Sequence, residues 1–236
     1  MKQTQAFIST YTADVSGVCS ALFELGGMTV MHDASGCNST YNTHDEPRWY
    51  DMDSLVYISG LSELEAVMGD DEKLISDITD AARQLKPRFI ALAGTPIPMI
   101  TGCDLPAIAR EVERRTKIPS FAVPSNGIGT YVSGAGQALR LYAERFITKK
   151  ADRKPNAVNI LGATPLDFSV NGTVQEMAHR LQDAGFTVQS VFAMGSEISA
   201  IENASAAKVN LVVSSVGLPV AEYLQKTFGT PYVVGA

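Results

Sequence analysis

Apolar residues recur at helical spacing near the start of the chain and then run without interruption. Positions i, i+3, i+4, i+7 and i+8 of this stretch are Val15, Val18, Cys19, Leu22 and Phe23. This spacing predicts a helix with one buried face, which begins near Asp14 and ends at a double glycine. Residues 28–32 then form a short apolar run with β-branched residues, which predicts a strand buried on both faces.

Helical periodicity and short apolar runs alternate along the rest of the chain. The pattern predicts helices at 70–85, 104–117, 134–148, 171–185, 197–206 and 218–228, and strands at 55–59, 89–93, 118–123, 157–162, 188–193, 209–214 and 232–235. This alternation is typical of an α/β fold with parallel sheets.

A charged, proline-containing segment at 149–155 interrupts the alternation. We therefore predict an N-terminal α/β domain at 1–150 and a second, Rossmann-like domain at 151–236. The chain ends on a strand without a closing helix. We expect the second domain to be incomplete and the sequence to be a piece of a longer protein.

Composition excludes several classes of function. The net charge of −6 argues against a nucleic-acid partner, because phosphate binding needs a basic patch. The first residues lack the apolar core of a signal peptide, and no apolar run is long enough to span a membrane. Three widely spaced cysteines do not suggest a disulfide framework, so we expect a reducing cytoplasm.

The candidate chemistry begins directly after the predicted strand 28–32. The hexapeptide 32–37 places His32 and Cys37 in a polar loop at the carboxyl end of that strand, where sites form in open α/β sheets. No periodic apolar face surrounds Cys37, which favours metal ligation or a subunit-interface role; a buried thiol is the alternative.

The hexapeptide His-Asp-Ala-Ser-Gly-Cys resembles the His-Gly-Pro-x-Gly-Cys loop of the nitrogenase component 1 family, which includes the cofactor-assembly scaffold and the dark-operative protochlorophyllide reductase. Segments 61–74, 102–105 and 124–134 are similar to further family motifs in the same order. The resemblance implies three Rossmann-like domains per subunit, of which the third is missing here. It also implies an iron–sulfur cluster bound by Cys37 near a subunit interface, a homo-oligomer or a paralogous subunit as partner, and an ATP-dependent iron protein as electron donor.

The sequence departs from this family at two of the three usual cysteine positions. They fall at Tyr11 or Thr12 and at Thr95-Pro96. Cys19 could substitute, because two thiolates from each of two subunits would supply the four that a [4Fe–4S] cluster needs. Its place on the apolar helix face favours core packing instead.

Other polar residues allow two interpretations each. His32 is a catalytic candidate or a hydrogen-bonded structural histidine. His44 and Arg48 could meet an anionic substrate or a partner subunit, or lie on a solvated loop. Cys103, at a helix start, has either a lowered thiol pKa or a structural capping role. Glycines at 127–134 lack the G-x-G-x-x-G spacing, so a tight turn is favoured over nucleotide binding.

Two functional hypotheses follow. The first is a nitrogenase-like oxidoreductase subunit, with Cys37 and less favourably Cys19 as metal ligands and with His32 and Arg48 near an unknown substrate. The second is a non-catalytic metallocofactor scaffold or small-molecule-binding protein that has lost the cluster. A dinucleotide-dependent dehydrogenase is disfavoured by the missing fingerprint.

Overall fold

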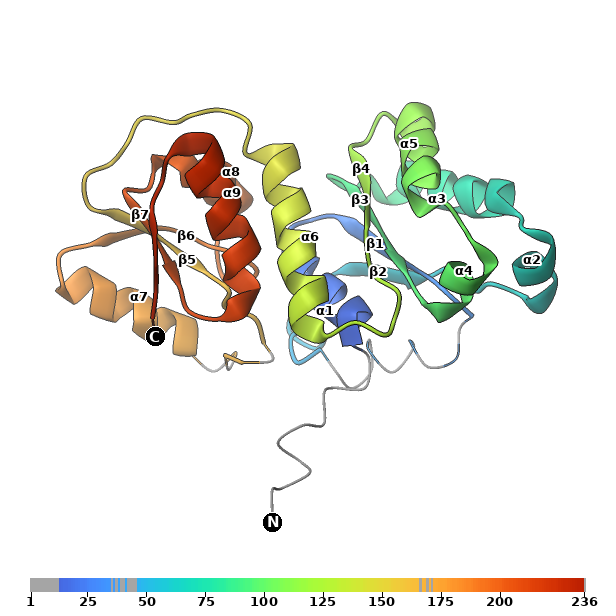
Figure 1. The fold of residues 1–236 in the computed structure, drawn as a ribbon, viewed down its shortest axis with the longest axis horizontal. Coiled ribbons are helices and arrows are strands. Elements are labelled where there is room, and N and C mark those ends of the chain that lie inside the picture. The colour runs from blue at the N-terminus through green and yellow to red at the C-terminus, as the bar shows by residue number, and fades with distance from the viewer. Residues whose placement is uncertain are drawn as a thin grey trace, which may run out of the picture. The chain divides into compact units, whose positions relative to one another are not determined.

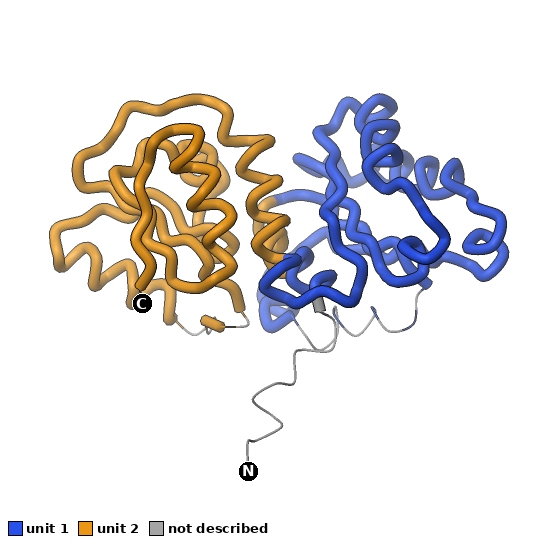
Figure 2. The backbone as a smooth tube through the Cα atoms, in the orientation of Figure 1, with its two compact units in different colours: residues 1–19, 26–134 blue, residues 20–25, 135–236 orange. Residues whose placement is uncertain are grey.

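The computed structural model describes residues 13–34, 36, 38, 41, 46–165, 167–168, 170 and 172–235. Cys37, His44 and positions 11–12 lie outside the described residues. The described chain forms two four-stranded parallel sheets with helices (Figure 1) and confirms the predicted α/β class. Two compact units divide it (Figure 2), residues 1–19 with 26–134 and residues 20–25 with 135–236. The proposed boundary between 150 and 151 stays a prediction.

The first sheet has the strand order β2-β1-β3-β4. Its unit contains α1 (Ala13–Leu22, of which 13–19 belong here), β1 (Met28–His32), β2 (Leu55–Ile58), α2 (Glu63–Met68), α3 (Asp71–Leu85), β3 (Ile90–Gly94), α4 (Pro96–Thr101), α5 (Leu105–Thr116), β4 (Ser120–Val123) and the first residues of α6 (Tyr131–Phe146). All five residues of β1 are buried, as predicted for a central strand.

Helices α3 and α5 cover one face of this sheet. Their apolar stripes pack on alternate residues of the two central strands, Met28 and Val30 on β1 and Ile90 and Leu92 on β3. Residues of one parity in neighbouring parallel strands point to the same face, so these four side chains form one layer. The layer anchors the two strands whose carboxyl ends carry the candidate site.

The second sheet has the strand order β6-β5-β7-β8. Its unit contains most of α6 with β5 (Ala157–Leu161), α7 (Thr173–Asp183), β6 (Thr187–Val191), α8 (Ile198–Glu202), β7 (Val209–Val212), α9 (Leu218–Phe228) and β8 (Tyr232–Val234). A buried polar row crosses it: Ser190 donates to Asn159 at 2.7 Å, and Asn159 donates to Asn210 at 2.7 Å. A register slip would leave these groups unpaired, so the row helps to specify strand pairing.

Two short helices, α2 and α4, were not predicted from the sequence. Each has six residues, too few for a full period of apolar positions, and α4 contains two prolines. Helix α2 is instead held by a capping box, in which Ser62 and Glu65 each accept a backbone N–H of the other. No helix in the described part of the chain is long and apolar enough to cross a membrane.

The glycine segment after β4 is folded around one carboxylate. Asp14 is 3% exposed and accepts the backbone N–H groups of Asn126 and Gly127 at 2.9 and 2.8 Å. The Asn126 side chain accepts the N–H groups of Ile128 and Gly129. These backbone donors are the ones that a phosphate would need, so the geometry supports the tight-turn interpretation.

We expect Asp14→Ala to lower the free energy of unfolding by about 2 to 4 kcal/mol, because two backbone donors lose a charged acceptor. Urea denaturation measures this loss. Asp152→Ala, at an exposed aspartate, is the control and should change stability by less than about 0.5 kcal/mol. Equal losses in the two variants would contradict the role of Asp14.

Candidate functional site

The candidate site lies at the carboxyl edge of the first sheet. Because all four strands are parallel, the residues that follow them meet along one edge. A hydroxyl side chain follows each of three strands: Ser59 after β2, Thr95 after β3, and Ser125 two residues after the end of β4. Strand β1, which precedes the predicted loop with Cys37, lies between β2 and β3 in the sheet.

His32 ends β1 and is 8% exposed. Its Nδ1 lies 2.8 Å from Ser59 Oγ. Ser59 Oγ also accepts the N–H of Asp33 at 3.1 Å and donates to the Asp33 carbonyl at 3.3 Å. Because the Ser59 hydroxyl donates its proton to the Asp33 carbonyl, Nδ1 of His32 is the donor in its contact with Ser59. Nε2 then keeps an acceptor lone pair.

Burial lowers the pKa of His32 below its usual value. The carboxylates of Asp71, Asp33 and Glu65 act in the opposite direction but do not outweigh desolvation. His32 is therefore neutral near pH 7. The structural interpretation of His32 agrees with these contacts, and its catalytic role stays a prediction.

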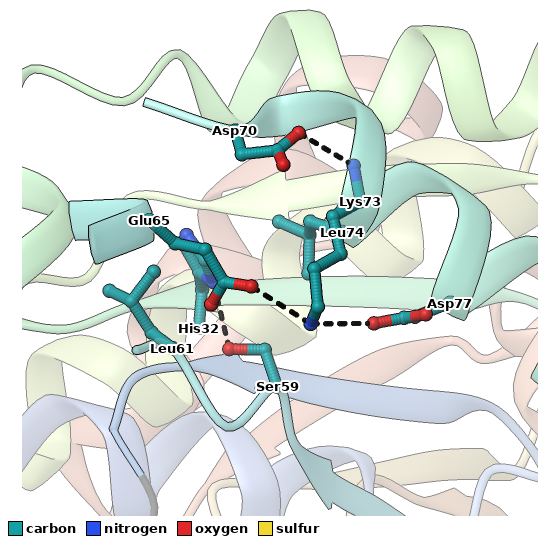
Figure 3. Close-up of a pocket in the computed structure, with 8 residues that line it drawn as sticks. All are labelled: His32, Ser59, Leu61, Glu65, Asp70, Lys73, Leu74 and Asp77. Atoms are coloured by element: carbon teal, nitrogen blue, oxygen red, sulfur yellow. Dashed lines mark hydrogen bonds and ion pairs between the residues drawn. The ribbon is translucent and has the colours of Figure 1, made fainter. Parts of the chain in front are cut away.

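A small pocket lies beside His32 and Ser59 (Figure 3). Lys73 reaches into it between two carboxylates, 3.2 Å from Glu65 and 3.1 Å from Asp77. Hydrogen bonds to Asp77 and Glu65 raise the pKa of Lys73, which fixes its positive charge. The ammonium of Lys73 thus offsets the negative charge of Glu65 and Asp77. Asp70, which also lines the pocket, caps α3 by accepting the N–H of Lys73.

Thr95 occupies one of the positions where the family resemblance predicts a ligand cysteine. It is 1% exposed, and its hydroxyl donates to the His32 carbonyl at 2.8 Å. A hydroxyl that already donates to a backbone acceptor is a poor metal ligand, because ligation would require its deprotonation and the loss of this bond. Thr95 therefore joins β3 to β1 instead.

Cys19 is fully buried in α1. Burial, and secondarily the charge of Glu46, raise the pKa of its thiol strongly. A protonated thiol among apolar side chains suits core packing, and metal ligation by Cys19 stays a prediction.

Cys103 lines a cavity of about 380 Å³ below the carboxyl ends of β3 and β4. Its thiol faces Asp71, with 3.9 Å between Sγ and Oδ1. Burial and then the Asp71 charge raise the pKa of Cys103 to about 11. The position at the start of a helix therefore does not produce a reactive thiolate. Met99, Leu105, Pro106 and Ala122 also line this cavity, which is mostly apolar.

Arg48 is buried and forms an ion pair with Glu46. Its Nε and second terminal nitrogen donate to the two Glu46 oxygens at 2.7 and 3.0 Å, and Tyr41 donates to the same carboxylate at 3.0 Å. A buried bidentate pair holds its segment in place. A substrate contact for Arg48 stays a prediction, and this contact set was not expected from the sequence.

Among the described residues, no group of three or more histidine, cysteine, aspartate or glutamate side chains is placed to hold a metal ion. With the Thr95 hydroxyl bonded to the His32 carbonyl and Cys19 buried in the core, the described residues do not supply a three-thiolate half-site. Sequence reasoning missed the three hydroxyl residues of the edge. The available signal was a serine or threonine within two residues of the end of three predicted strands.

The pKa of His32 predicts a pH dependence of stability. Histidine in the unfolded chain has a pKa of about 6.5, and the lower value in the folded state means that the unfolded chain binds the proton more readily. Stability from this group is complete above about pH 6.5 and is lost as the pH falls through the folded-state value. Thermal unfolding from about pH 8 to about pH 5 should show a smaller loss for His32→Asn than for the unchanged protein. The exposed control His179→Asn should follow the unchanged protein.

Asp71→Asn removes a charge that raises the pKa of Cys103, so we expect the thiol to react about two- to tenfold faster with iodoacetamide at mildly alkaline pH. Mass mapping of the labelled peptide measures this rate. Asp80→Asn, later on the same helix, should leave it unchanged. A rate that is the same in all three proteins would show that desolvation alone controls the thiol.

Comparisons with known proteins agree with the resemblance. The family described as nitrogenase component 1 type oxidoreductase matches residues 14–236. The nitrogenase iron-molybdenum cofactor biosynthesis protein NifE of Clostridium pasteurianum is 26% identical over 179 residues, covering 75% of this chain and 38% of NifE. A light-independent protochlorophyllide reductase subunit of Staurastrum punctulatum is 30% identical over 178 residues, covering 70% of this chain and 34% of that protein.

A solved structure titled nitrogenase Cp1 at pH 5 matches with a TM-score of 0.78 and 20% identity, over 99% of this chain and 49% of that one. This likeness supports the fold. The chain thus covers 34% to 49% of the length of these three proteins. With the family match over nearly all of its residues, the chain belongs to the nitrogenase component 1-type oxidoreductase family.

Proposed function

We propose that this chain is a subunit of a nitrogenase component 1-like oxidoreductase in which Cys37 binds an iron–sulfur cofactor at a contact with a second subunit. The partner is a second copy or a paralogous chain, and an ATP-dependent iron protein supplies electrons for the reduction of a substrate that the residues do not identify. The observation that carries the proposal is the family match, together with the position of His32, which ends a central strand at the carboxyl edge of the sheet and precedes Cys37 by five residues in the sequence.

Exposed apolar side chains near this edge support assembly with other proteins. Helix α2 has no buried residue, and α2 and α4 contact each other. Their exposed apolar side chains are Leu64, Val67, Met68, Met99 and Ile100, with exposed fractions from 46% to 78%. Neighbouring exposed apolar residues on a soluble domain are typical of a protein–protein contact.

A second candidate function is a cofactor scaffold or small-molecule-binding protein that has lost the cluster. Two observations favour it. The Thr95 hydroxyl is committed to a backbone carbonyl at a position where a ligand was expected, and an apolar cavity of about 380 Å³ lies under the same edge.

Anaerobic purification of the protein from iron-supplied cells distinguishes the two functions. The first predicts a brown protein with bound iron and sulfide, and Cys37→Ala should lose most of both. Cys103→Ala is the matched control, since it also removes one thiol, and should keep the colour. A colourless protein, or colour that survives Cys37→Ala, would reject Cys37 as the ligand and favour the second function.

A further inference from the structure

The described residues at this edge do not provide a group of metal ligands, and their hydrogen bonds show what holds the edge. Strand β1 pairs with β3 up to His32 and Gly94. The next residue, Thr95, adds one more link through its hydroxyl to the His32 carbonyl at 2.8 Å. This bond lies where the chain leaves the sheet, beyond the last pair of the ladder.

Ser59 makes the corresponding contact from the other neighbour of β1. Strand β2 pairs with β1 up to Ile58 and Met31, and the N–H of Ser59 donates to the Met31 carbonyl at 2.9 Å. The Ser59 hydroxyl then bonds both the N–H and the carbonyl of Asp33 and meets His32 Nδ1. The exit of β1 is therefore held on both sides by protein groups.

Asp33, the first residue after β1, makes three further hydrogen bonds. Its backbone carbonyl accepts the N–H of Leu61 at 2.8 Å. One carboxylate oxygen accepts the N–H of Ala34 at 2.9 Å, and the other accepts a hydrogen bond from the side chain of Asn38. Asn38 directly follows Cys37 in the sequence. The two ends of segment 33–38 are thus joined by described side chains.

We propose that Thr95 and Ser59 are positioning residues that fix the exit of β1 at His32 and Asp33 in the metal-free protein. Hydrogen bonds from these two hydroxyls hold the end of β1 in place, as thiolate–metal bonds would in a site organised by a cofactor. A cofactor bound at Cys37 is then an addition to a folded site, taken up after folding. This last statement rests on the proposed function; the role of the two hydroxyls does not.

Amide hydrogen exchange on the chelator-treated full chain tests the proposal. The amides of Asp33 and Leu61 should be protected without metal. In Ser59→Ala the Asp33 amide should exchange at least about tenfold faster, and Ser59→Thr should restore protection. The amide of Met28, which donates to the Phe89 carbonyl at the opposite edge, is the internal control.

A matched pair tests Thr95. Thr95→Val keeps the shape but removes the donor, and we expect its unfolding midpoint to fall by about 2 to 8 °C; Thr95→Ser keeps the hydroxyl and should retain the protection of Asp33. Asp33 and Leu61 amides that become protected only after reconstitution with ferrous iron and sulfide would overturn the proposal. Protected amides in a protein that never acquires Cys37-dependent colour would reject the proposed function and leave this inference standing.

Discussion

Hydrogen bonds from hydroxyl side chains hold the carboxyl edge of the first sheet, and the candidate site depends on them. Ser59 and Thr95 fix the exit of β1, and Ser125 fixes the exit of β3 by accepting the N–H of Gly94 and donating to its carbonyl at 2.9 and 3.1 Å. A strand that leaves a sheet loses its ladder partners, and its polar groups need others. Here the neighbouring strand supplies them, so the loops begin from fixed positions.

In the second sheet a hydroxyl side chain makes a similar contact after β7. After β7, the hydroxyl of Ser214 donates to the carbonyl of Gly162 at the end of β5 at 2.7 Å. Gly162 has a φ of +97°, and an added Cβ would lie within 2.8 Å of Ser214 and Gly217 backbone atoms. In the first unit a Cβ added at Gly94 would lie 2.7 Å from the Ser125 carbonyl oxygen, so both units combine a central strand, a short side chain after the neighbouring strand and a close backbone approach. This similarity is structural and does not depend on any shared chemistry.

The sequence predicted the long regular elements well, because their signal is local. Helix 218–228 agrees with α9 at both ends, and 70–85 agrees with α3 once Asp70 is counted as its cap. Short α2 and α4 were missed because six residues carry too little periodicity. Asp14, near which the first helix was predicted to begin, accepts two N–H groups from residues more than a hundred positions away, and no local pattern identifies these partners.

In the candidate site, too, some features follow from the sequence and others only from the tertiary structure. The sequence by itself determined the fold class, the family and the missing cysteines at two usual positions, since each depends on residue identity and spacing along the chain. Only the tertiary structure decided that Thr95 donates to His32, that Cys19 is sealed in the core and that Arg48 is paired with Glu46. Burial and hydrogen-bond partners are set by which strands become neighbours, and distant parts of the chain supply those neighbours.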